Sequence, residues 1–372
     1  MMQEDMIQIL KPNGELVDSA LEPKLSKEEL QKLYHSMVMV RLLDERMLML
    51  QRQGRIGFCV TCLGQEALAG SGLALQKNDW VFPAYREYVV ALIRGMPLLD
   101  MMGQYFGNEL DPLQGRQMPN HFSHKETNFV SISSPIGTQL GHAAGAAIAS
   151  KIKKDKNVVI TYCGDGGTSS TDFHAGLNMA AIHQAPCIFF CSNNQYAISV
   201  PVEKQTGVKV LVDKAKAYGM RGVRVDGNDV LAVYQVVKEA ADRAREGKGP
   251  TFIESVTFRM GPHSSSDDPT KYCPKEKFEA WAKKDPIQRF QVYLEKKGLW
   301  NEDFDKKLKE TLKQEILEAV EKVSKAAPPK ISTIFEGVYQ DMPYHLKIQH
   351  NELLEEAKHK GEFIDTSEKF PL

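Results

Sequence analysis

The residues most able to do chemistry are a glycine-rich run with one carboxylate, Gly164-Asp165-Gly166-Gly167, and a later amide, Asn194. A hard cation such as Mg²⁺ prefers oxygen ligands and often shares its coordination shell with phosphate oxygens. Asp165 and Asn194 supply two such oxygens, and we expect the backbone carbonyl of Tyr196 to supply a third. The last two glycines of the run let backbone N–H groups approach a phosphate closely. The pattern therefore predicts a magnesium and diphosphate site.

Other interpretations of these residues are weaker. The run could be only a tight glycine turn with a satisfied asparagine nearby. A dinucleotide-binding turn of the form GxGxxG would need glycine at position 169, where Ser169 stands. Cys59 and Cys62 have CxxC spacing, but no second pair accompanies them, and a tetrahedral zinc site needs four ligands. A zinc or redox role for that pair is a minor alternative.

Alternating apolar and amphipathic segments are expected to position these residues. The run 158–162 reads as a buried strand, 172–183 as a helix and 187–191 as the next strand, which together form a βαβ unit. Asp165 and Asn194 each follow a strand, so they should meet at the carboxyl edge of a parallel sheet, where open α/β folds bind ligands. The helix is expected to present its N-terminus to the diphosphate.

The remaining pattern extends the same architecture. Ser26 is a plausible N-cap for a helix over 26–53, and a helix over 230–245 precedes a strand over 251–257. We predict an α/β fold with a doubly wound, mostly parallel sheet. The expected division is an N-terminal extension and entry helix (1–53), the α/β binding domain (54–270) and a charged helical C-terminal region (271–372), which we expect to pack on a partner.

Composition narrows the class of protein. The chain has 372 residues with 47 basic and 48 acidic side chains, so no basic surplus favours nucleic acid or an anionic membrane. The longest apolar runs are strand-sized, far below the roughly 20 residues of a membrane helix. The first residues do not resemble a targeting signal. We expect a cytoplasmic protein that binds neither nucleic acid nor membrane, with its six cysteines reduced.

Longer stretches of the chain resemble one family. The glycine run and the segment 191–199 resemble the thiamine-diphosphate fingerprint of 2-oxo acid dehydrogenases, and more specifically the alpha subunit of their decarboxylating component. The resemblance covers nearly the whole chain. It continues through the segments Gly54–Phe58, Tyr85–Glu87, Gly115–Pro119, Ser133–Pro135 and His263–Asp268.

The resemblance implies a divided active site. Thiamine diphosphate and Mg²⁺ would bind this chain, while a beta subunit of an alpha2-beta2 heterotetramer would hold the pyrimidine ring and supply the activating glutamate. A lipoyl-bearing acyltransferase would accept the acyl group from a small 2-oxo acid. The cofactor-binding residues implied are Tyr85, Arg86, Ser134, Ile136, Gly164, Asp165, Gly166, Gly167, Asn194, Tyr196 and His263.

Particular roles follow from the same resemblance. His263 would be catalytic, as a general acid or hydrogen-bond donor in a mobile loop, and Phe58, Tyr85 and Ile136 would wall the substrate pocket. A departure at Cys59, where relatives place an aromatic residue, could enlarge that pocket. A potassium ion could bind a loop made of Ser133, Pro135, Thr138 and Gln139.

The substrate remains open at this level. The segments 115–119, 133–135 and 263–268 favour branched-chain 2-oxo acids of the 2-oxoisovalerate type, whereas 164–169 and 201–205 resemble pyruvate dehydrogenase equally well. One or two methylenes change discrimination by only about 1 to 3 kcal/mol. We expect branched-chain substrates, with pyruvate as the alternative. A structural subunit without activity is a third possibility, disfavoured by the intact site residues.

Overall fold

The sheet that positions the site has five parallel strands in the order β1-β2-β3-β7-β6. This computed structural model describes residues 6–360. A small antiparallel pair, β4 with β5, lies apart from the sheet. The strands are β1 Trp80–Phe82, β2 Val159–Gly164, β3 Cys187–Asn193, β4 Tyr196–Ala197, β5 Val200–Pro201, β6 Arg221–Asp226 and β7 Thr251–Val256.

Both faces of the sheet are covered, which is why the central strands read as unbroken apolar runs. Along β2, Ile160 and Tyr162 enter one hydrophobic core and Val159 and Cys163 enter the other. The strand β3 alternates in the same way. The helices, in chain order, are α1 Lys27–Arg52, α2 Ala69–Leu73, α3 Tyr88–Ile93, α4 Leu98–Phe106, α5 Thr138–Lys153, α6 Thr171–Ile182, α7 Val230–Arg245, α8 Lys275–Ala282, α9 Pro286–Lys296, α10 Glu302–Lys325 and α11 Tyr344–Lys360.

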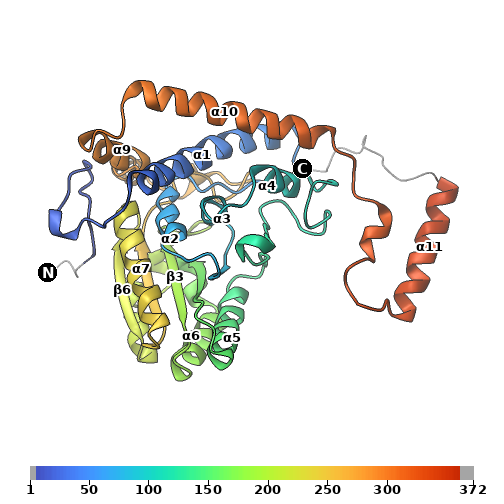
Figure 1. Cartoon of the computed structure of the whole chain (residues 1–372), viewed down its shortest axis with the longest axis horizontal. Coiled ribbons are helices and arrows are strands. Elements are labelled where there is room, and N and C mark those ends of the chain that lie inside the picture. The colour runs from blue at the N-terminus through green and yellow to red at the C-terminus, as the bar shows by residue number, and fades with distance from the viewer. Residues whose placement is uncertain (1–5, 361–372) are drawn as a thin grey trace.

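The helices divide between the two faces. The pair α5 and α6 packs on one face, where Leu140 and Phe173 are fully buried with strand residues. The other core draws on α1, α2, α3, α4, α7, α9 and α10. In Figure 1 the pair α5 and α6 lies at the green end of the sheet, while α1 and α10 run along the opposite side of the molecule. The sheet is therefore the middle layer of three.

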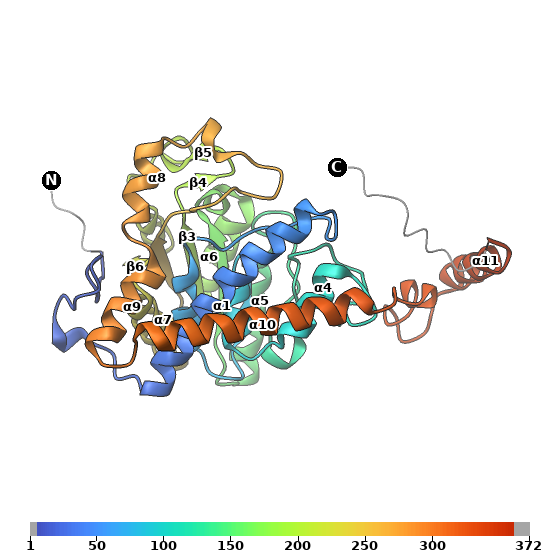
Figure 2. The same cartoon turned by 90° about the horizontal axis from the view of Figure 1, so that it is seen from above.

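The N-terminal helix and the C-terminal region pack together. The helix α1 begins with a capping box between Ser26 and Glu29, and α10 lies alongside it in both cartoon views (Figure 2). Apolar residues of α9 and α10, such as Phe290 and Leu312, are buried in the same core as α1. We expected the region after 271 to pack on a partner, but one face of α9 and α10 is already covered by this chain. The domain division itself remains a prediction.

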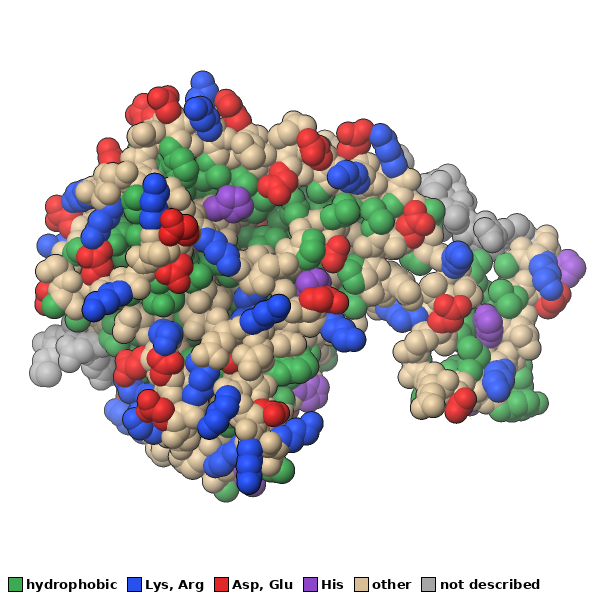
Figure 3. Space-filling view, viewed as in Figure 1, with side chains coloured by type: hydrophobic (Ala, Val, Ile, Leu, Met, Phe, Trp, Pro, Cys, Tyr) green, Lys and Arg blue, Asp and Glu red, His purple; other side chains and the backbone are tan. Residues whose placement is uncertain are grey.

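A short helical arm extends beyond α10. It consists of the 3-10 turn Ile331–Ile334 and α11, which contact each other, and Phe335 and His350 form a ring pair within it. Figure 3 shows this arm standing apart from the main body. Among residues 6–360, no helix is long and apolar enough to cross a membrane.

The sequence-based expectations for these elements are confirmed closely. The α/β class and the parallel sheet are correct, and the helix α7 has the predicted bounds. The strand β2 ends two residues later than predicted, because its pairing with β3 continues to Gly164. The predicted helical C-terminal region is divided into separate helices near Pro286 and Asn301, where the side chains of Asp285 and Asn301 cap new helices.

Candidate active site

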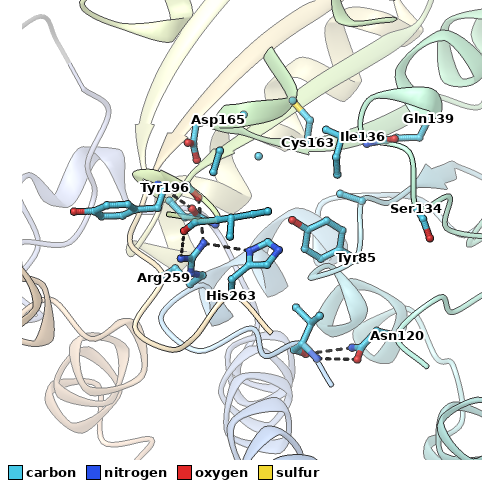
Figure 4. Close-up of a pocket in the computed structure, with 18 of the residues that line it drawn as sticks. Tyr85, Asn120, Ser134, Ile136, Gln139, Cys163, Asp165, Tyr196, Arg259 and His263 are labelled. Carbon is cyan, nitrogen blue, oxygen red and sulfur yellow. Dashed lines mark hydrogen bonds between the residues drawn. The ribbon is translucent and has the colours of Figure 1, made fainter. Parts of the chain in front are cut away.

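A cavity of about 440 Å³ lies at the carboxyl ends of β2 and β3. Figure 4 shows Asp165 and Tyr196 at one end, Ser134 and Asn120 at the other, and Tyr85 facing His263 between them. Most of the predicted site residues line it. These are Phe58, Tyr85, Ser134, Ile136, Gln139, Gly164, Asp165, Gly166, Gly167, Asn194, Tyr196 and His263.

Asp165 is the anionic group of the cavity. Its carboxylate is only 1% exposed, and burial raises its pKa although a hydrogen bond from Gln205 partly opposes this. The Gln205 amide donates to one carboxylate oxygen at 2.6 Å and also to the Val200 carbonyl at 2.9 Å. Gln205 therefore fixes the orientation of Asp165. This contact could not be predicted from a local sequence pattern, because 40 residues separate the two positions.

Asn194 and Tyr196 complete the predicted metal ligands. The Asn194 amide nitrogen donates to the Gln65 side-chain oxygen at 3.3 Å, and its oxygen accepts a long hydrogen bond of 3.4 Å from the Tyr196 backbone N–H. The Tyr196 carbonyl accepts a hydrogen bond from Arg259 at 3.1 Å, and a neighbouring guanidinium nitrogen of Arg259 donates to the Ile198 carbonyl at 2.6 Å. Arg259 thus fixes the backbone that would present a carbonyl to a cation.

The glycine turn differs in one respect from the expectation. Residues Asp165–Ser169 form a 3-10 turn, and α6 starts only at Thr171, capped by the Ser170 side chain. Because Ser170 satisfies the first turn of α6, the backbone facing the cavity belongs to the 3-10 turn instead of the helix N-terminus. A Cβ added to Gly166 would lie 2.6 Å from the Ala197 Cβ, so glycine is required there.

Arg86 and His263 form a buried cluster beside Tyr85. One guanidinium nitrogen of Arg86 donates to the His263 carbonyl at 2.8 Å and lies 3.3 Å from its Nδ1, and the other contacts the Thr61 carbonyl. Arg86 also lies 5.2 Å from the centre of the Tyr85 ring. Arg86 does not line the cavity wall itself. It holds the histidine that does.

Glu87 stabilises the backbone segment that contains Tyr85 and Arg86. Its carboxylate accepts hydrogen bonds from the backbone N–H groups of Ala84 at 2.9 Å and Arg86 at 3.1 Å. Burial raises its pKa to about 7. Glu87 therefore orders the segment that carries Tyr85.

The electrostatic surroundings of His263 make its ring neutral. Burial, Arg86 and Arg259 lower its pKa to about 4. Guanidinium groups can only donate hydrogen bonds, so the Nδ1 that faces Arg86 must accept and the proton belongs on Nε2. This arrangement favours a hydrogen-bond donor over an imidazolium acid.

The loop carrying His263 is ordered by one carboxylate. Asp267 accepts from the His263 backbone N–H at 2.6 Å and from the Tyr272 hydroxyl at 2.5 Å, and that hydroxyl accepts from Arg259 at 2.7 Å. These bonds connect the loop to Arg259 and hence to the hairpin of β4 and β5. Arg86 and Asp267 thus hold His263 from two sides.

The opposite end of the cavity is formed by Ser134 and Ile136. The Ser134 hydroxyl lies 3.2 Å from the His121 ring. Ile136 is 52% exposed, as is Ile198 at 56%, although both are β-branched apolar residues. The rim of the cavity is therefore apolar and uncovered in this chain.

The predicted potassium loop is only partly assembled. The Thr138 hydroxyl donates to the Pro135 carbonyl at 3.1 Å, so these two residues are adjacent, and the Gln139 amide donates to the Tyr162 carbonyl at 2.7 Å. Of the four predicted ligands, only Gln139 lines the cavity, and no contact places Ser133 with the others. The potassium site remains a prediction.

Several lining residues were not predicted. They are Val60, Ala84, Met118, Asn120, His121, Cys163, Ala197, Ile198 and Arg259. Cys59 is fully buried and does not line the cavity, and its predicted effect of enlarging the pocket remains a prediction. Cys62 is equally buried, and both thiols are free. Among residues 6–360, no group of three His, Cys, Asp or Glu side chains could hold a metal.

The residues present fit a hydrated hard cation with a diphosphate. A carboxylate, an amide and a backbone carbonyl offer only oxygen, which suits Mg²⁺ and not zinc. The amide nitrogen of Gln65 and the amide oxygen of Gln205, both beside these ligands, are buried without a partner. A Cβ on Gly164 would meet nothing within 4 Å, so there is open space above the turn.

Comparison with known proteins agrees with this fold and site. The chain belongs to the family described as "Dehydrogenase E1 component", whose sequence model matches residues 34–332. The family is thiamine-diphosphate-dependent, and within it this chain is an alpha subunit of a 2-oxo acid dehydrogenase component.

Three relatives illustrate the range of similarity. The pyruvate dehydrogenase E1 component subunit alpha of Bacillus cereus is 42% identical over 360 residues, covering 96% of this chain and 94% of the relative. The protein of the same name from Staphylococcus aureus is 42% identical over 358 residues, with the same coverage. The mitochondrial 2-oxoisovalerate dehydrogenase subunit alpha of Mus musculus is 40% identical over 356 residues, covering 95% of this chain and 80% of the relative.

Proposed function

We propose that this chain, with a beta subunit, catalyses the thiamine-diphosphate-dependent oxidative decarboxylation of branched-chain 2-oxo acids and transfers the acyl group to a lipoyl group. The observation that carries the proposal is the polarity of the cavity. Its lining combines Asp165, Asn194 and a glycine turn with apolar side chains such as Phe58 and Val60. A charged cofactor tail and an apolar acyl chain need both kinds of surface.

The polar part of this lining would hold the cofactor through Mg²⁺. Asp165, Asn194 and the Tyr196 carbonyl would bind the ion, and backbone N–H groups at Gly166 and Gly167 would meet the diphosphate. Tyr85 lines the cavity and is the nearer candidate for diphosphate contact. Arg86 would contribute positive charge while keeping its hydrogen bond to His263.

The chain itself would supply orientation, exclusion of water and one hydrogen bond. When bound, thiamine diphosphate supplies the ring that accepts the electron pair released with carbon dioxide. His263 would donate a hydrogen bond from Nε2 toward the reacting carbonyl or carboxylate oxygen. Ile136, which lines the cavity and is half exposed, would support the bound cofactor from one side.

The cavity is incomplete without a partner. Among the described lining residues, Asp165 is the only carboxylate, so the glutamate that would activate the cofactor has no candidate here. Ile136 and Ile198 leave apolar surface open at the rim. A beta subunit in an alpha2-beta2 heterotetramer would supply the acid and cover the rim, and a lipoyl-bearing acyltransferase would then take up the acyl group.

Pyruvate is the second candidate substrate, favoured by the names of the bacterial relatives. The branched-chain preference is supported by the mouse relative and by apolar lining residues such as Val60, Ala84 and Met118, which would contact a branched chain. A reducing compartment such as the cytoplasm suits the six free thiols, five of them buried.

The test is a co-purified complex of this chain with its beta subunit, assayed with thiamine diphosphate and Mg²⁺. We expect kcat/KM for 3-methyl-2-oxobutanoate to exceed that for pyruvate by about tenfold, the scale of one or two buried methylenes. Activity of this chain alone would contradict the shared site. A higher kcat/KM for pyruvate would contradict the branched-chain proposal and support pyruvate as the substrate.

A further inference from the structure

Two cysteines outside the predicted machinery lie opposite each other next to the glycine turn. Cys163 on β2 and Cys191 on β3 are register partners in adjacent parallel strands. Both side chains point to the face covered by α5 and α6, where they belong to the same hydrophobic core. Neighbouring strands are about 4.8 Å apart, within the Cα separation of about 4.4 to 6.8 Å that a disulfide accepts.

No other cysteine on these strands has this arrangement. Cys187 lies on the same strand and the same face as Cys191 and is also fully buried, but its register partner is Val159. Cys163 and Cys191 therefore differ from Cys187 in that each faces another cysteine on the adjacent strand. Cys187 serves as a matched control.

A small oxidant can reach this pair from the cavity. Cys163 contributes to the cavity lining, whereas Cys191 lies behind it in the core. In Figure 4 Cys163 stands next to Ile136, above the space between Asp165 and Tyr85. Access therefore passes through the space that the cofactor would fill, and a bound cofactor should protect the thiols.

A bond between these thiols would alter the glycine turn. A Cβ added to Gly167 would lie 2.9 Å from the Cys163 Cβ and 3.8 Å from its Sγ, so the turn rests on the Cys163 side chain. The Lys214 ammonium donates hydrogen bonds to the carbonyl and hydroxyl oxygens of Thr168 in the same turn, each at 2.9 Å. Drawing Cys163 toward Cys191 would therefore move the contacts that support the turn.

We propose that Cys163 and Cys191 form a reversible disulfide on exposure to a hydroperoxide, and that this bond weakens cofactor binding at the adjacent glycine turn. The two S–H bonds break and one S–S bond forms. The peroxide O–O bond breaks and takes up two electrons and both protons, so hydrogen peroxide yields two waters. The effect on the cofactor rests on the proposed function, whereas the disulfide does not.

The first measurement is the disulfide itself. The full chain in complex with its beta subunit, stripped of cofactor and metal, is treated with hydrogen peroxide, alkylated and mapped by mass spectrometry without reduction. We expect a Cys163 to Cys191 bond in the wild type and in Cys187→Ala, and no disulfide of Cys163 in Cys191→Ala. A disulfide between Cys163 and a different cysteine in Cys191→Ala, or the absence of a Cys163 to Cys191 bond in the wild type, would overturn the proposal. Circular dichroism confirms that each variant is folded.

The second measurement is cofactor affinity by calorimetry. We expect oxidised complex to bind thiamine diphosphate at least about tenfold more weakly than reduced complex, with recovery after dithiothreitol, and we expect no oxidation-dependent change in Cys191→Ala. An equal affinity of the oxidised and reduced forms would refute the effect on binding. If the reduced complex bound no thiamine diphosphate, the proposed function would fail instead, while the disulfide measurement would stand.

Discussion

Asp165 is buried to a degree that a free carboxylate rarely tolerates. Removing a charge from water is costly unless it is paired or coordinates a metal. Gln205 supplies one neutral hydrogen bond at 2.6 Å, which is insufficient to offset the loss of hydration, and the raised pKa reflects this. A bound divalent cation would restore the balance. The buried carboxylate thus lowers the stability of the protein, and a bound cation would offset that loss.

This cost leads to a prediction for Asp165→Asn. The amide keeps the shape of the side chain but removes the charge that would bind Mg²⁺. We expect Mg²⁺-dependent affinity for thiamine diphosphate to fall by more than about tenfold in calorimetry, with an unfolding free energy equal to or above that of the wild type. Asp172→Asn, exposed in the first turn of α6, is the control and should bind normally. Retained affinity in Asp165→Asn would remove Asp165 from the metal site.

His263 gives a prediction about pH. Its pKa is about 4 when folded against an ordinary value of 6.5, because of burial and two guanidinium groups. Between these values the unfolded chain binds the proton more readily, so this contribution to stability is present above pH 6.5 and is lost as the pH falls toward 4. The unfolding free energy in urea should decrease between pH 7 and pH 5 in the wild type, and this decrease should be smaller by about 1 kcal/mol in His263→Gln, allowing for the partial exposure of the ring.

The control for this effect is His142→Gln. His142 is exposed on α5, so its removal should leave the pH dependence of the wild type unchanged. Equal pH dependence in His263→Gln and the wild type would show that the His263 ring is not held in the neutral form.

Residues that end a strand could be predicted from the sequence, and residues that approach from loops could not. Asp165 and Asn194 follow apolar runs whose parallel pairing fixes where they meet. Gln205 and Arg259 reach the site through contacts that bridge 40 and 63 residues, and no local pattern records such distances. His263 was found only because its loop resembles a known family, since a histidine between polar residues carries no signal of its own.

The hairpin of β4 and β5 stores strain next to the cavity. Ile198 has a φ of 54°, in the left-handed region that β-branched residues avoid. It is kept there by its turn position between the two strands and by the hydrogen bond from Arg259 to its carbonyl. Strained residues of this kind gather at ligand sites because the surrounding structure holds them. The hairpin thus presents an apolar side chain to the cavity at the expense of stability.

Replacing Ile198 by asparagine should relieve this strain. Asparagine tolerates the left-handed conformation, whereas a β-branched residue there costs about 1 to 2 kcal/mol. Because Ile198 is 56% exposed, little burial is lost, and we expect the urea unfolding free energy to rise by about 1 kcal/mol. Val200→Asn, in the same hairpin but without a positive φ, should give no gain. A loss of stability in Ile198→Asn would show that its packing outweighs the strain.

At the scale of elements, hydrophobic periodicity predicted where helices form better than it predicted which elements they pack against. The helix α10 was predicted correctly as charged and helical, yet it was expected to pack on another subunit. Only five of its residues are buried, among them Leu312 and Val320, and they face α1 and α4. A helix with so narrow an apolar stripe looks the same in the sequence whether its own chain or a partner covers it.

The whole molecule divides into a three-layer body and an arm. No described residue after Val323 belongs to either hydrophobic core. The arm is connected to the body mainly by hydrogen bonds near its base, from Arg116 to the carbonyls of Thr333 and Glu336 and between Glu109 and Ala327. The folding unit should therefore end near Pro329, beyond α10, and not at the boundary of the predicted binding domain.

A chain shortened after Pro329 tests this division. Among the described residues, the contacts that the body would lose are mainly the exposed ones of Arg116, so we expect the unfolding free energy in urea to change by less than about 1 kcal/mol, in keeping with solvent-exposed polar interactions. Leu312→Ala in α10 is the contrasting variant, and it should cost about 2 to 5 kcal/mol because a fully buried side chain leaves a cavity against α1. If the shortened chain were destabilised as much as Leu312→Ala, the arm would belong to the folding unit. A second unfolding transition in Leu312→Ala, with the sheet intact, would instead support the predicted separation of the C-terminal region from the binding domain.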